Sequence, residues 1–379
     1  MLAYAGRRVR MLKQRWDKLA SAMEASHVSG VALMPGPNMF YLTGLSMGLS
    51  ERPTLLVVGR EGTVSLIMPQ LERQKGEAVA DCLQRQGVQA RFHVYSYTDE
   101  AGPHKAFEEA FHGKTGTWAL EYTALRMLEY SLMKAVLGEF AWVDAGEIMK
   151  GLRVVKDTGE LEAMQEAARL ADMGADIARN LLTPGKRATE IALEIEWKLR
   201  QEGADRVYMS LATGPDTAIP HAGTSSRVIE SGDLAWLDLC VNVRGYWSDI
   251  TRTYAIGGIP EELRRIYEIV LEAQERARLN AKPGMTGAQV DALAREVIAG
   301  HGYGHRFIHR TGHGLGLEIH EEPYIVATNH RPLPAGSTFT IEPGIYIPGK
   351  GGVRIEDDVV LTGEGARSLT QYPRNLLDM

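Results

Sequence analysis

The sequence lacks the features that mark secreted, membrane and nucleic-acid-binding proteins. Cysteine occurs only twice in 379 residues, at Cys82 and Cys240, which excludes a disulfide framework and fits a reducing cytoplasm. No uninterrupted run of about 18 apolar residues occurs, so we expect no membrane span. The net charge of −6 gives no reason to expect nucleic acid or an anionic membrane as a partner. The basic N-terminus lacks the apolar core of a secretion signal, and residues 7–24 predict an amphipathic helix instead.

The length and the order of the expected elements predict two domains. A chain of 379 residues is long for a single core, and its 44% hydrophobic content is ample for burial. Residues 1–150 alternate helical stretches with short strands at 30–34, 54–58, 64–67 and 118–121, which indicates an α/β domain. A helix from Thr158 to about Leu182, with Thr158 as its N-cap, is expected to open the second domain, residues 151–379.

A first pair of carboxylates lies in a hairpin predicted between residues 234 and 254. With residues 242–245 as the loop, Asp238 stands directly opposite Asp249. Directly opposed side chains share one face of a sheet, with Cβ atoms roughly 4.5–5.5 Å apart. Two negative charges at that separation repel, so the pair indicates a bound cation or a shared proton. Two solvated carboxylates on an ordinary hairpin are the competing interpretation of this pair alone.

A second pair of carboxylates favours a metal site. Glu342 and Glu356 flank a turn centred on Gly349, and this register again places the two side chains opposite one another. One such pair could be accidental, but a second in the same register is much less so.

An internal repeat connects the two hairpins. Pro184-Gly185 and Pro283-Gly284 each precede a helical pattern, and each pattern is followed by one of the hairpins. A glycine also stands six residues before the first carboxylate of each pair. The second domain is therefore predicted to consist of two similar halves, each a pair of helices with an antiparallel hairpin, related by a pseudo-twofold axis.

One histidine of the glycine-rich segment 310–321 is the expected nitrogen ligand. His301, His305, His309 and His313 recur every four residues, which on a helix would make a zinc-binding stripe. Five glycines between residues 302 and 316 oppose a helix, at a cost of up to about 1 kcal/mol each in a helix interior. We therefore expect His301 and His305 on the surface or in a loop. The glycine-rich run also lacks the Lys-Ser or Lys-Thr of a phosphate-binding loop.

These segments resemble the metallopeptidase family with the pita-bread fold, in particular its proline-directed branch of Xaa-Pro dipeptidases (prolidases) and Xaa-Pro aminopeptidases. The resemblance covers most of the chain and implies a creatinase-like N-terminal domain followed by an α+β pita-bread domain. Cys240 departs from the family pattern, because many relatives have glycine two residues after the first Asp. The metal ligands of the family fall on Asp238, Asp249, His313, Glu342 and Glu356.

The resemblance also assigns residues around the metal ligands. The substrate-contacting and proton-handling histidines of the family fall on His221, His309 and His320, its active-site tyrosine on Tyr346, and its active-site arginine on Arg354. From the residues alone, His221 would be a turn histidine and Arg354 an ordinary strand charge. Arg354 lies two residues from Glu356, so it faces the same side and could orient that carboxylate by a bidentate contact.

Four carboxylates and one imidazole form an oxygen-rich site that suits Mn²⁺ and also admits Zn²⁺ or Co²⁺. We expect two divalent ions, with Asp249 and Glu356 contacting both, Asp238 the first, and His313 with Glu342 the second. Glu342 is expected to carry the proton of the attacking water to the leaving nitrogen. His221 and His320 are expected to donate hydrogen bonds to the carbonyl oxygen.

The implied substrate is a small peptide with proline in the second position. Hydrolysis of Xaa-Pro dipeptides is favoured over the alternative, an Xaa-Pro aminopeptidase that acts on longer peptides. A dipeptidase needs a cation for the free carboxylate of proline. Arg354 is one candidate, and Arg52, which a neighbouring subunit could contribute, is the other. Arg52 could equally make only a surface contact with Glu51. We also expect a homodimer, with residues 40–49 as an exposed apolar patch beside the neighbouring subunit.

Three other functions fit parts of the sequence. The five intact ligands oppose a metal-free relative resembling creatinase, and the intact histidines oppose a non-catalytic binding module. A methionine aminopeptidase shares the ligands but usually lacks the long N-terminal domain.

Overall fold

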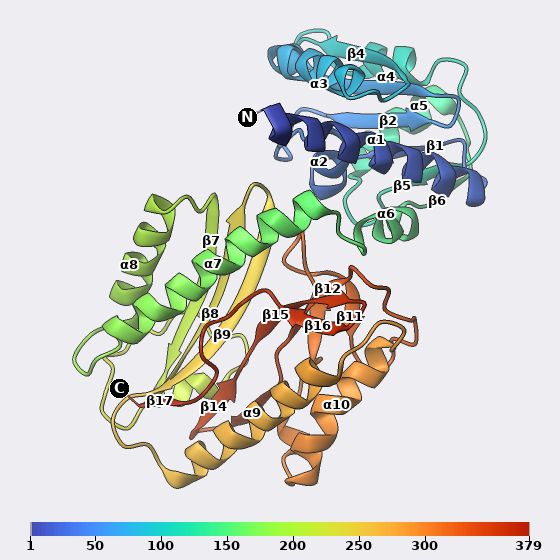
Figure 1. Cartoon of the computed structure of the whole chain (residues 1–379). Coiled ribbons are helices and arrows are strands. Elements are labelled where there is room, and N and C mark those ends of the chain that lie inside the picture. Colours follow the sequence, from blue (N-terminus) through green and yellow to red (C-terminus); the bar gives the residue numbers. More distant parts are fainter. Residues whose placement is uncertain (1, 379) are drawn as a thin grey trace. The chain divides into compact units, whose positions relative to one another are not determined.

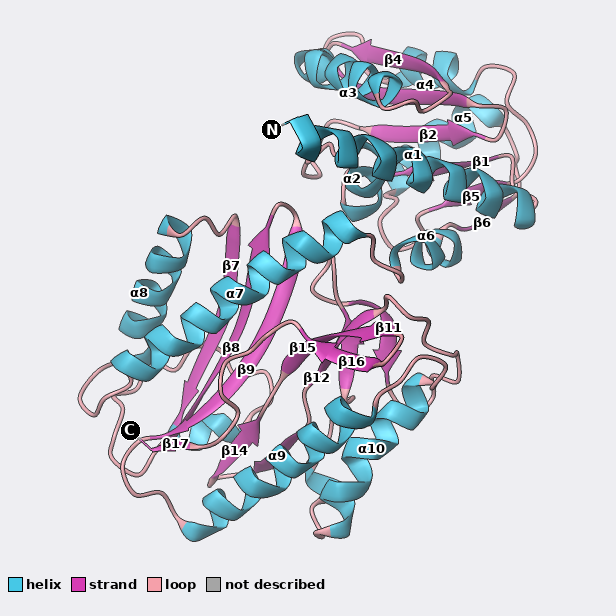
Figure 2. Ribbon diagram, viewed as in Figure 1, coloured by secondary structure: helices cyan, strands magenta, loops and turns pink. Residues whose placement is uncertain are grey.

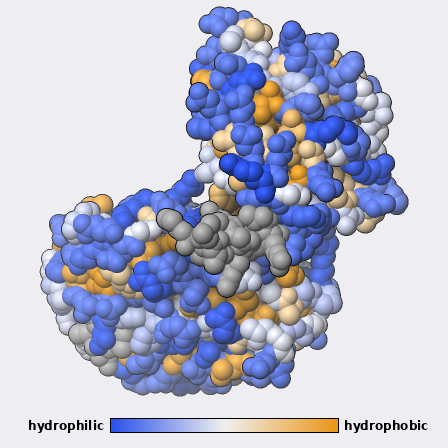
Figure 3. Space-filling model, turned by 45° about the horizontal axis from the view of Figure 1, so that its top comes forward, coloured by the Kyte–Doolittle hydropathy of each residue, from blue (hydrophilic) through white to orange (hydrophobic). Residues whose placement is uncertain are grey.

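The structure is a computed structural model that describes the backbone of residues 2–378 and the side chains of residues 12–376. The chain separates into two compact units, Met1–Arg153 and Val154–Met379. Figures 1 and 2 show their helices and strands. Within the described range, no helix is both long enough and apolar enough to cross a membrane. The face drawn in Figure 3 is mostly hydrophilic, with apolar groups scattered among the polar ones.

The N-terminal unit is a six-stranded sheet covered by helices on both faces, which confirms the predicted α/β architecture (Figure 2). Successive residues of the second strand face opposite sides: Leu55 packs with Phe107, whereas Leu56 faces Leu83. The sheet order is β4-β3-β2-β1-β5-β6. The elements are α1 (Leu2–Ala25), β1 (Gly30–Leu33), α2 (Pro37–Thr43), β2 (Leu55–Gly59), β3 (Thr63–Pro69), η1 (Gln70–Glu72), α3 (Arg73–Arg85), β4 (Arg91–Tyr97), α4 (His104–Phe111), β5 (Trp118–Leu120), α5 (Met127–Leu137), β6 (Trp142–Asp144) and α6 (Gly146–Arg153).

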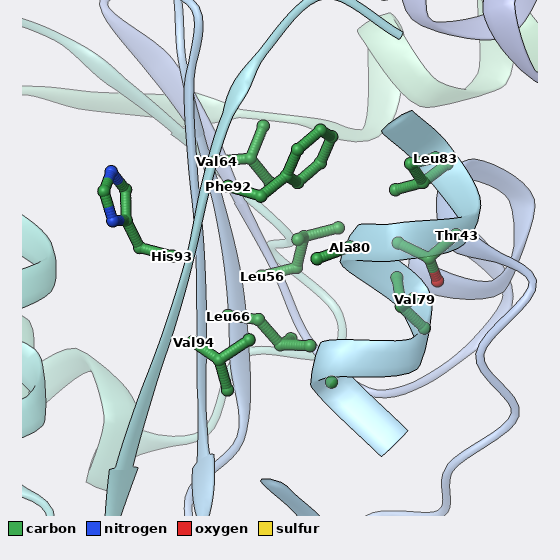
Figure 4. Close-up of a pocket in the computed structure, with 11 residues that line it drawn as sticks. Thr43, Leu56, Val64, Leu66, Val79, Ala80, Leu83, Phe92, His93 and Val94 are labelled. Atoms are coloured by element: carbon green, nitrogen blue, oxygen red, sulfur yellow. The ribbon is translucent and has the colours of Figure 1, made fainter. Parts of the chain in front are cut away.

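A small apolar cavity lies between α3 and this sheet (Figure 4). Leu56 and Phe92 line it from the strands and Leu83 from the helix. His93 points to the other side of β4, where its ring stacks on Tyr95 with 5.9 Å between the ring centroids. Because the cavity walls are almost entirely apolar, we assign the cavity to packing and not to ligand binding.

The first half of the C-terminal unit packs two helices on a sheet ordered β17-β9-β8-β7, with α7 crossing the long strands (Figure 1). Helix α7 begins with a capping box, in which Asp157 and Glu160 each accept a backbone N–H of the other at 2.9 Å. The N-cap is therefore Asp157, and the predicted cap at Thr158 was wrong because the Asp is paired with a Glu three residues later. The elements are α7 (Thr158–Leu181), α8 (Ala188–Gln201), β7 (Arg206–Thr213), η2 (Gly214–Ala218), β8 (Leu234–Val243), β9 (Tyr246–Ala255) and β17 (Leu377–Asp378).

The second half repeats this plan, which confirms the predicted internal repeat. Two helices pack on a sheet ordered β11-β10-β12-β15-β16, with a separate β13-β14 hairpin. The matching glycines Gly232 and Gly336 both adopt left-handed φ values, 96° and 90°, that a side chain would oppose. The elements are α9 (Glu261–Asn280), α10 (Gly287–Gly300), η3 (Gly304–Arg306), β10 (Gly312–Gly314), β11 (Glu321–Ile325), β12 (Thr338–Ile341), β13 (Gly344–Ile347), β14 (Gly351–Arg354), β15 (Asp357–Thr362) and β16 (Gly365–Ser368).

Candidate metal centre

The β8–β9 hairpin turns through two residues. Arg244 and Gly245 have positive φ values, 54° and 88°, and Val243 already pairs with Tyr246. Such a tight turn requires left-handed backbone at both positions. The prediction placed four residues in this loop, so its register was wrong by two residues.

The corrected register still places both Asp side chains on the same face. Asp238 pairs with Thr251, and Asp249 pairs with Cys240, so the two carboxylates are diagonal neighbours and not direct partners. Side chains alternate between the faces of a strand, so a slip of two residues preserves the face and a slip of one would not. Cys240 takes the place opposite Asp249 that had been predicted for Asp238.

Glu342 and Glu356 lie at a break in a longer hairpin whose register is centred on Gly349, as predicted. On one side of the break Ile341 pairs with Asp357, and on the other Gly344 pairs with Arg354. The shared register places Glu342 opposite Glu356 across the break. Glu342 and Glu356 therefore lie where the backbone pairing of this hairpin is interrupted.

The break allows Glu356 to join the other half of the unit. Its backbone N–H donates to the carbonyl of Thr251 on β9 at 3.1 Å. The Thr251 hydroxyl in turn donates to the Glu356 carboxylate at 2.6 Å. Both bonds are buried, and they fix the second carboxylate pair beside the first.

His313, the predicted nitrogen ligand, lies on the short strand β10. Its side chain is buried, and its Nε2 lies 3.3 Å from Glu342 Oε1. A Cβ at Gly312 would overlap the backbone carbonyl of Thr340, and one at Gly314 would overlap that of Glu322. The glycines on both sides of His313 therefore allow its strand to approach its neighbours closely enough to bring the imidazole to the carboxylates.

The donor atoms converge in two overlapping groups that fit a divalent cation. Asp249, His313 and Glu356 have donor atoms within 4.8 Å of one another, and so do Asp238, Cys240 and Asp249. Asp249 Oδ1 is buried with no hydrogen-bond partner among the described residues. A buried carboxylate oxygen without a donor is destabilising unless a cation binds it.

The electrostatics of the carboxylates support the same conclusion. Burial, and then the charge of Asp238, raise the pKa of Asp249 well above its usual range. Burial, and then the charge of Asp249, raise the pKa of Glu356 in the same way. Their ionised forms are therefore unfavourable without a cation, and a divalent ion would reverse this.

Arg354 is buried beside these carboxylates. Its Nη2 donates to Asp238 Oδ2 at 2.5 Å, its Nη1 to the Tyr346 hydroxyl at 3.0 Å, and its Nε to the Thr251 hydroxyl at 3.1 Å. The predicted bidentate contact with Glu356 was wrong, because Thr251 lies between the two and donates to Glu356 itself. Arg354 therefore joins Asp238 to Tyr346 through one guanidinium group.

Two of the predicted active-site histidines contact this group. His309 Nε2 lies 2.9 Å from the Tyr346 hydroxyl, and burial lowers the pKa of His309 to about 4. The His320 ring lies edge-on to the His313 ring, with 4.2 Å between the ring centroids. Burial, and then the charge of Arg310, lower the pKa of His320. Both imidazoles are therefore neutral near pH 7 and can donate one hydrogen bond each.

His221 lies at the exposed side of the site. It follows Pro220, whose carbonyl accepts a hydrogen bond from Arg354 Nη1 at 2.9 Å. Its charge contributes to the lowered pKa values of His309 and His320, so the structure brings the three histidines together.

The other two histidines of the four-residue series lie outside the site. Helix α10 ends at Gly300, and His301 and His305 are exposed beyond it, as predicted. His301 Nε2 lies 3.4 Å from Glu272 at the surface. The glycines that follow thus end the helix, and the zinc-stripe interpretation is wrong.

Arg52, in the N-terminal unit, already has carboxylate partners. Its Nε and Nη2 donate to the two Asp99 oxygens at 2.8 Å each, and its Nη1 lies 2.6 Å from Glu51. A substrate carboxylate would have to compete with both.

The apolar run at residues 40–49 is largely buried, so the predicted exposed patch was wrong. Its first part belongs to α2, with Tyr41 and Leu42 fully buried. Trp16 Nε1 donates to the carbonyl of Leu42 at 2.8 Å, which ties this helix to α1. Among the large apolar residues of the run, Leu49 is exposed, at 53%.

Asp358 is a buried carboxylate behind the metal ligands that the sequence analysis missed. It accepts the Ser248 hydroxyl at 2.6 Å and the backbone N–H of Asp249 at 2.9 Å. Burial raises the pKa of Asp358 to about 8. The acidic run 356–358 within a buried strand was the available signal, because buried carboxylates require partners.

A buried ion pair next to the histidines was also missed. Lys156 Nζ lies 2.8 Å from Glu321 Oε1, and the two side chains are only 1% and 7% exposed. Glu321 directly follows His320, so the pair anchors the segment that carries this histidine. The partners are 165 residues apart, and no local pattern connects them.

Comparison with known proteins is consistent with this geometry. Residues 162–363 match metallopeptidase family M24, and residues 15–155 match the creatinase/prolidase N-terminal domain. The chain is 38% identical to the Xaa-Pro dipeptidase of Pyrococcus furiosus over 372 residues, which cover 97% of this chain and 100% of that protein. The crystal structure of a prolidase from Thermococcus sibiricus superposes with a TM-score of 0.89 at 35% identity, covering 97% and 99% of the two chains. An X-Pro aminopeptidase from Thermotoga maritima superposes with a TM-score of 0.81 at 31% identity, covering 96% and 99%.

Proposed function

Because the chain belongs to metallopeptidase family M24, we propose that its metal centre hydrolyses the peptide bond before proline in Xaa-Pro dipeptides. The likeness to Xaa-Pro dipeptidases runs over nearly the whole length of both chains. The observation that carries the chemistry is the convergence of Asp238, Asp249, His313 and Glu356 around Asp249 Oδ1, which has no hydrogen-bond partner among the described residues. Glu342 joins this group through His313, 3.3 Å away. The enzyme is thus a metal-dependent Xaa-Pro peptidase.

For the metal centre we propose two divalent ions, with Mn²⁺ as the preferred metal and Zn²⁺ or Co²⁺ as alternatives. Asp249 and Glu356 would contact both ions, Asp238 the first, and His313 with Glu342 the second. The oxygen-rich ligand set supports Mn²⁺, since hard carboxylate ligands suit it. When bound, such ions supply Lewis-acid activation of water and of the peptide carbonyl.

The proton transfers are assigned to Glu342. Burial, moderated by the opposing charge of Arg354, raises the pKa of Glu342 to about 7 in the absence of a bound cation. A bound cation would lower this pKa, so the ionised carboxylate could accept a proton. Glu342 would take a proton from the attacking water and deliver it to the proline nitrogen, which has no N–H of its own.

His320 and His221 are assigned to the substrate carbonyl. His320 lies against His313, and His221 interacts electrostatically with His320. Each would donate a hydrogen bond that strengthens as negative charge develops on the carbonyl oxygen. Tyr346, held by Arg354, orients His309 beside the leaving group.

The free carboxylate of the dipeptide needs a cation. Four of the five N–H donors of Arg354 bond to Asp238, Tyr346, Thr251 and the Pro220 carbonyl, so Arg354 serves better to hold the site than to bind this carboxylate. Arg52 would have to leave Asp99 and Glu51 to bind it. Arg310, whose guanidinium lies 4.6 Å from the centroid of the Tyr324 ring, is a third candidate that the sequence analysis missed.

The deciding experiment compares an Xaa-Pro dipeptide with the same peptide extended by one residue. We expect kcat/KM of the metal-replete enzyme to be higher for the dipeptide, because its free carboxylate can make a charge-assisted contact with the arginine that the extended peptide cannot make in the same place. The variant that removes the true carboxylate clamp, Arg52→Ala or Arg310→Ala, should lose this preference. Equal cleavage of both peptides would make the enzyme an aminopeptidase, and no cleavage of either after metal loading would exclude both activities.

We further propose a homodimer in the cytoplasm. The free thiols of Cys82 and Cys240 support a reducing compartment. Exposed apolar side chains of the N-terminal unit, including Met127 (75%) and Trp142 (42%), support an interface with a second copy. Sedimentation at assay concentration tests this, and a fully active monomer would contradict it.

A further inference from the structure

Cys240 lies among the metal ligands. It pairs with Asp249 across the β8–β9 ladder, so the two side chains share the face that carries Asp238. Its sulfur lies within 4.8 Å of donor oxygens of both Asp residues. Donor atoms around a single ion are separated by distances of this order, since Zn–S and Zn–O bonds measure about 2.3 and 2.0–2.2 Å.

A second observation also points to a ligand at this position. Asp249 is 5% exposed, and its Oδ1 has no hydrogen-bond partner among the described residues. Asp249 also belongs to both groups of converging donors. A cation that satisfies this carboxylate on the side of Asp238 lies within reach of the Cys240 sulfur.

The surroundings of Cys240 shield its sulfur from solvent. Tyr208 pairs with Cys240 on its other side, in strand β7, so its side chain shares the same face. The Tyr208 ring stacks on that of Trp247, with 5.4 Å between the ring centroids. The two rings, from β7 and β9, meet over the intervening strand β8, and Cys240 is only 9% exposed.

We infer that Cys240 is an additional protein ligand of the metal centre, on the side of Asp238. The inference rests on the proposed metallopeptidase function and extends it to metal selection. When an ion binds, the S–H bond breaks, the proton leaves to solvent, and the sulfur donates an electron pair to the ion. A soft sulfur donor favours Co²⁺ and Zn²⁺ over Mn²⁺ relative to an all-oxygen site.

Cobalt substitution tests this directly, because a thiolate bound to Co²⁺ produces a near-ultraviolet charge-transfer band that oxygen and nitrogen ligands do not. The full chain is stripped with a chelator and loaded with Co²⁺, and bound cobalt is quantified. We expect the band in the parent and in Cys82→Ala, and its loss in Cys240→Ala and Cys240→Ser. The ratio of Co²⁺ to Mn²⁺ affinity should also fall in both Cys240 variants. Cys82→Ala is the matched control, because it leaves Cys240 as the single thiol of the chain.

The outcomes separate this inference from the proposed function. Cobalt bound by the parent without a charge-transfer band would show a thiol that only hydrogen-bonds Asp249, and would overturn the ligand assignment alone. A band that survives in Cys240→Ala, or disappears in Cys82→Ala, would overturn it as well. A parent that binds no cobalt would overturn both proposals. Should the Cys240 variants fail to fold, the spectrum of Cys82→Ala still tests the assignment, because Cys240 is the single thiol left to produce the band.

Discussion

Replacing Asp249 with Asn should stabilise the protein in the absence of metal and abolish its activity. Asn keeps the shape of the side chain and removes its charge. Donor atoms of Asp249 and Asp238 lie within 4.8 Å. Two unit charges at that outer limit repel by about 3 kcal/mol at an effective dielectric constant of 20. We therefore expect a gain of about 1–3 kcal/mol in the free energy of unfolding when no cation is bound.

The pH dependence fixes the sign of this effect. Burial and Asp238 raise the pKa of Asp249 above its unfolded value of 3.8, so above that pH the folded state binds more protons than the unfolded state. The metal-free parent therefore loses stability as the pH rises through the folded pKa, and Asp249→Asn lacks this loss. The advantage of the variant should be larger at pH 8 than at pH 5.

Thermal unfolding in EDTA measures this, since 1 kcal/mol corresponds to about 2–4 °C for domains of 150–250 residues. Adding Mn²⁺ should reverse the order, because the parent gains stability from binding and the variant does not. Asp357→Asn is the control. Burial would raise the pKa of Asp357, but Arg252 and Arg374 hold it below its usual value, so its removal should cost about 3–5 kcal/mol. An Asp249→Asn protein less stable than the parent in EDTA at pH 8 would refute the reasoning.

Three further outcomes follow from the contacts of the site. Burial lowers the pKa of His309 from 6.5 to about 4, so the parent loses stability as the pH falls through this window. In urea unfolding, the free energy of unfolding of His309→Gln should fall by up to about 3 kcal/mol less than that of the parent between pH 6.5 and 4. The same fall with pH in both proteins would contradict a buried neutral imidazole. Arg354→Lys keeps the charge but loses the fork that joins Asp238 to Tyr346. Metal affinity or kcat/KM should fall about 10–100-fold, and unchanged values would exclude a positioning role. His221→Ala and His320→Ala should keep their metal by atomic absorption but lose about 10²–10³-fold in kcat, whereas loss of metal would make that histidine a ligand.

The sequence predicted the two hairpins and the face that each presents, because face depends only on the alternation of side chains. It did not predict the register of the β8–β9 hairpin, because register depends on the conformation of the turn. Arg244 adopts φ 54°, a conformation that its residue type does not favour. Asp238 and Asp249 still converge because the slip was of even length. The second hairpin was predicted in register because Gly349 marked its turn.

Contacts between the two halves of the C-terminal unit could not be predicted from the sequence. Arg354 was expected beside Glu356, its neighbour along the strand, but its guanidinium contacts Asp238, 116 residues away. Thr251, 105 residues from Glu356, prevents the expected contact, because its hydroxyl lies between the side chains of Arg354 and Glu356. Such pairings arise from the docking of the halves and leave no periodic pattern in either segment.

The interruption of the second hairpin at Glu342 and Glu356 has a kinetic consequence. Asp238 and Asp249 belong to one continuous hairpin, which can form early from local contacts. Glu356 reaches them only through its bridge to Thr251, and this requires closure of a much longer loop. The refolding chain therefore presents an incomplete set of ligands until its halves dock. We expect tight metal binding only after the halves have docked, and we expect a bound ion to slow their separation.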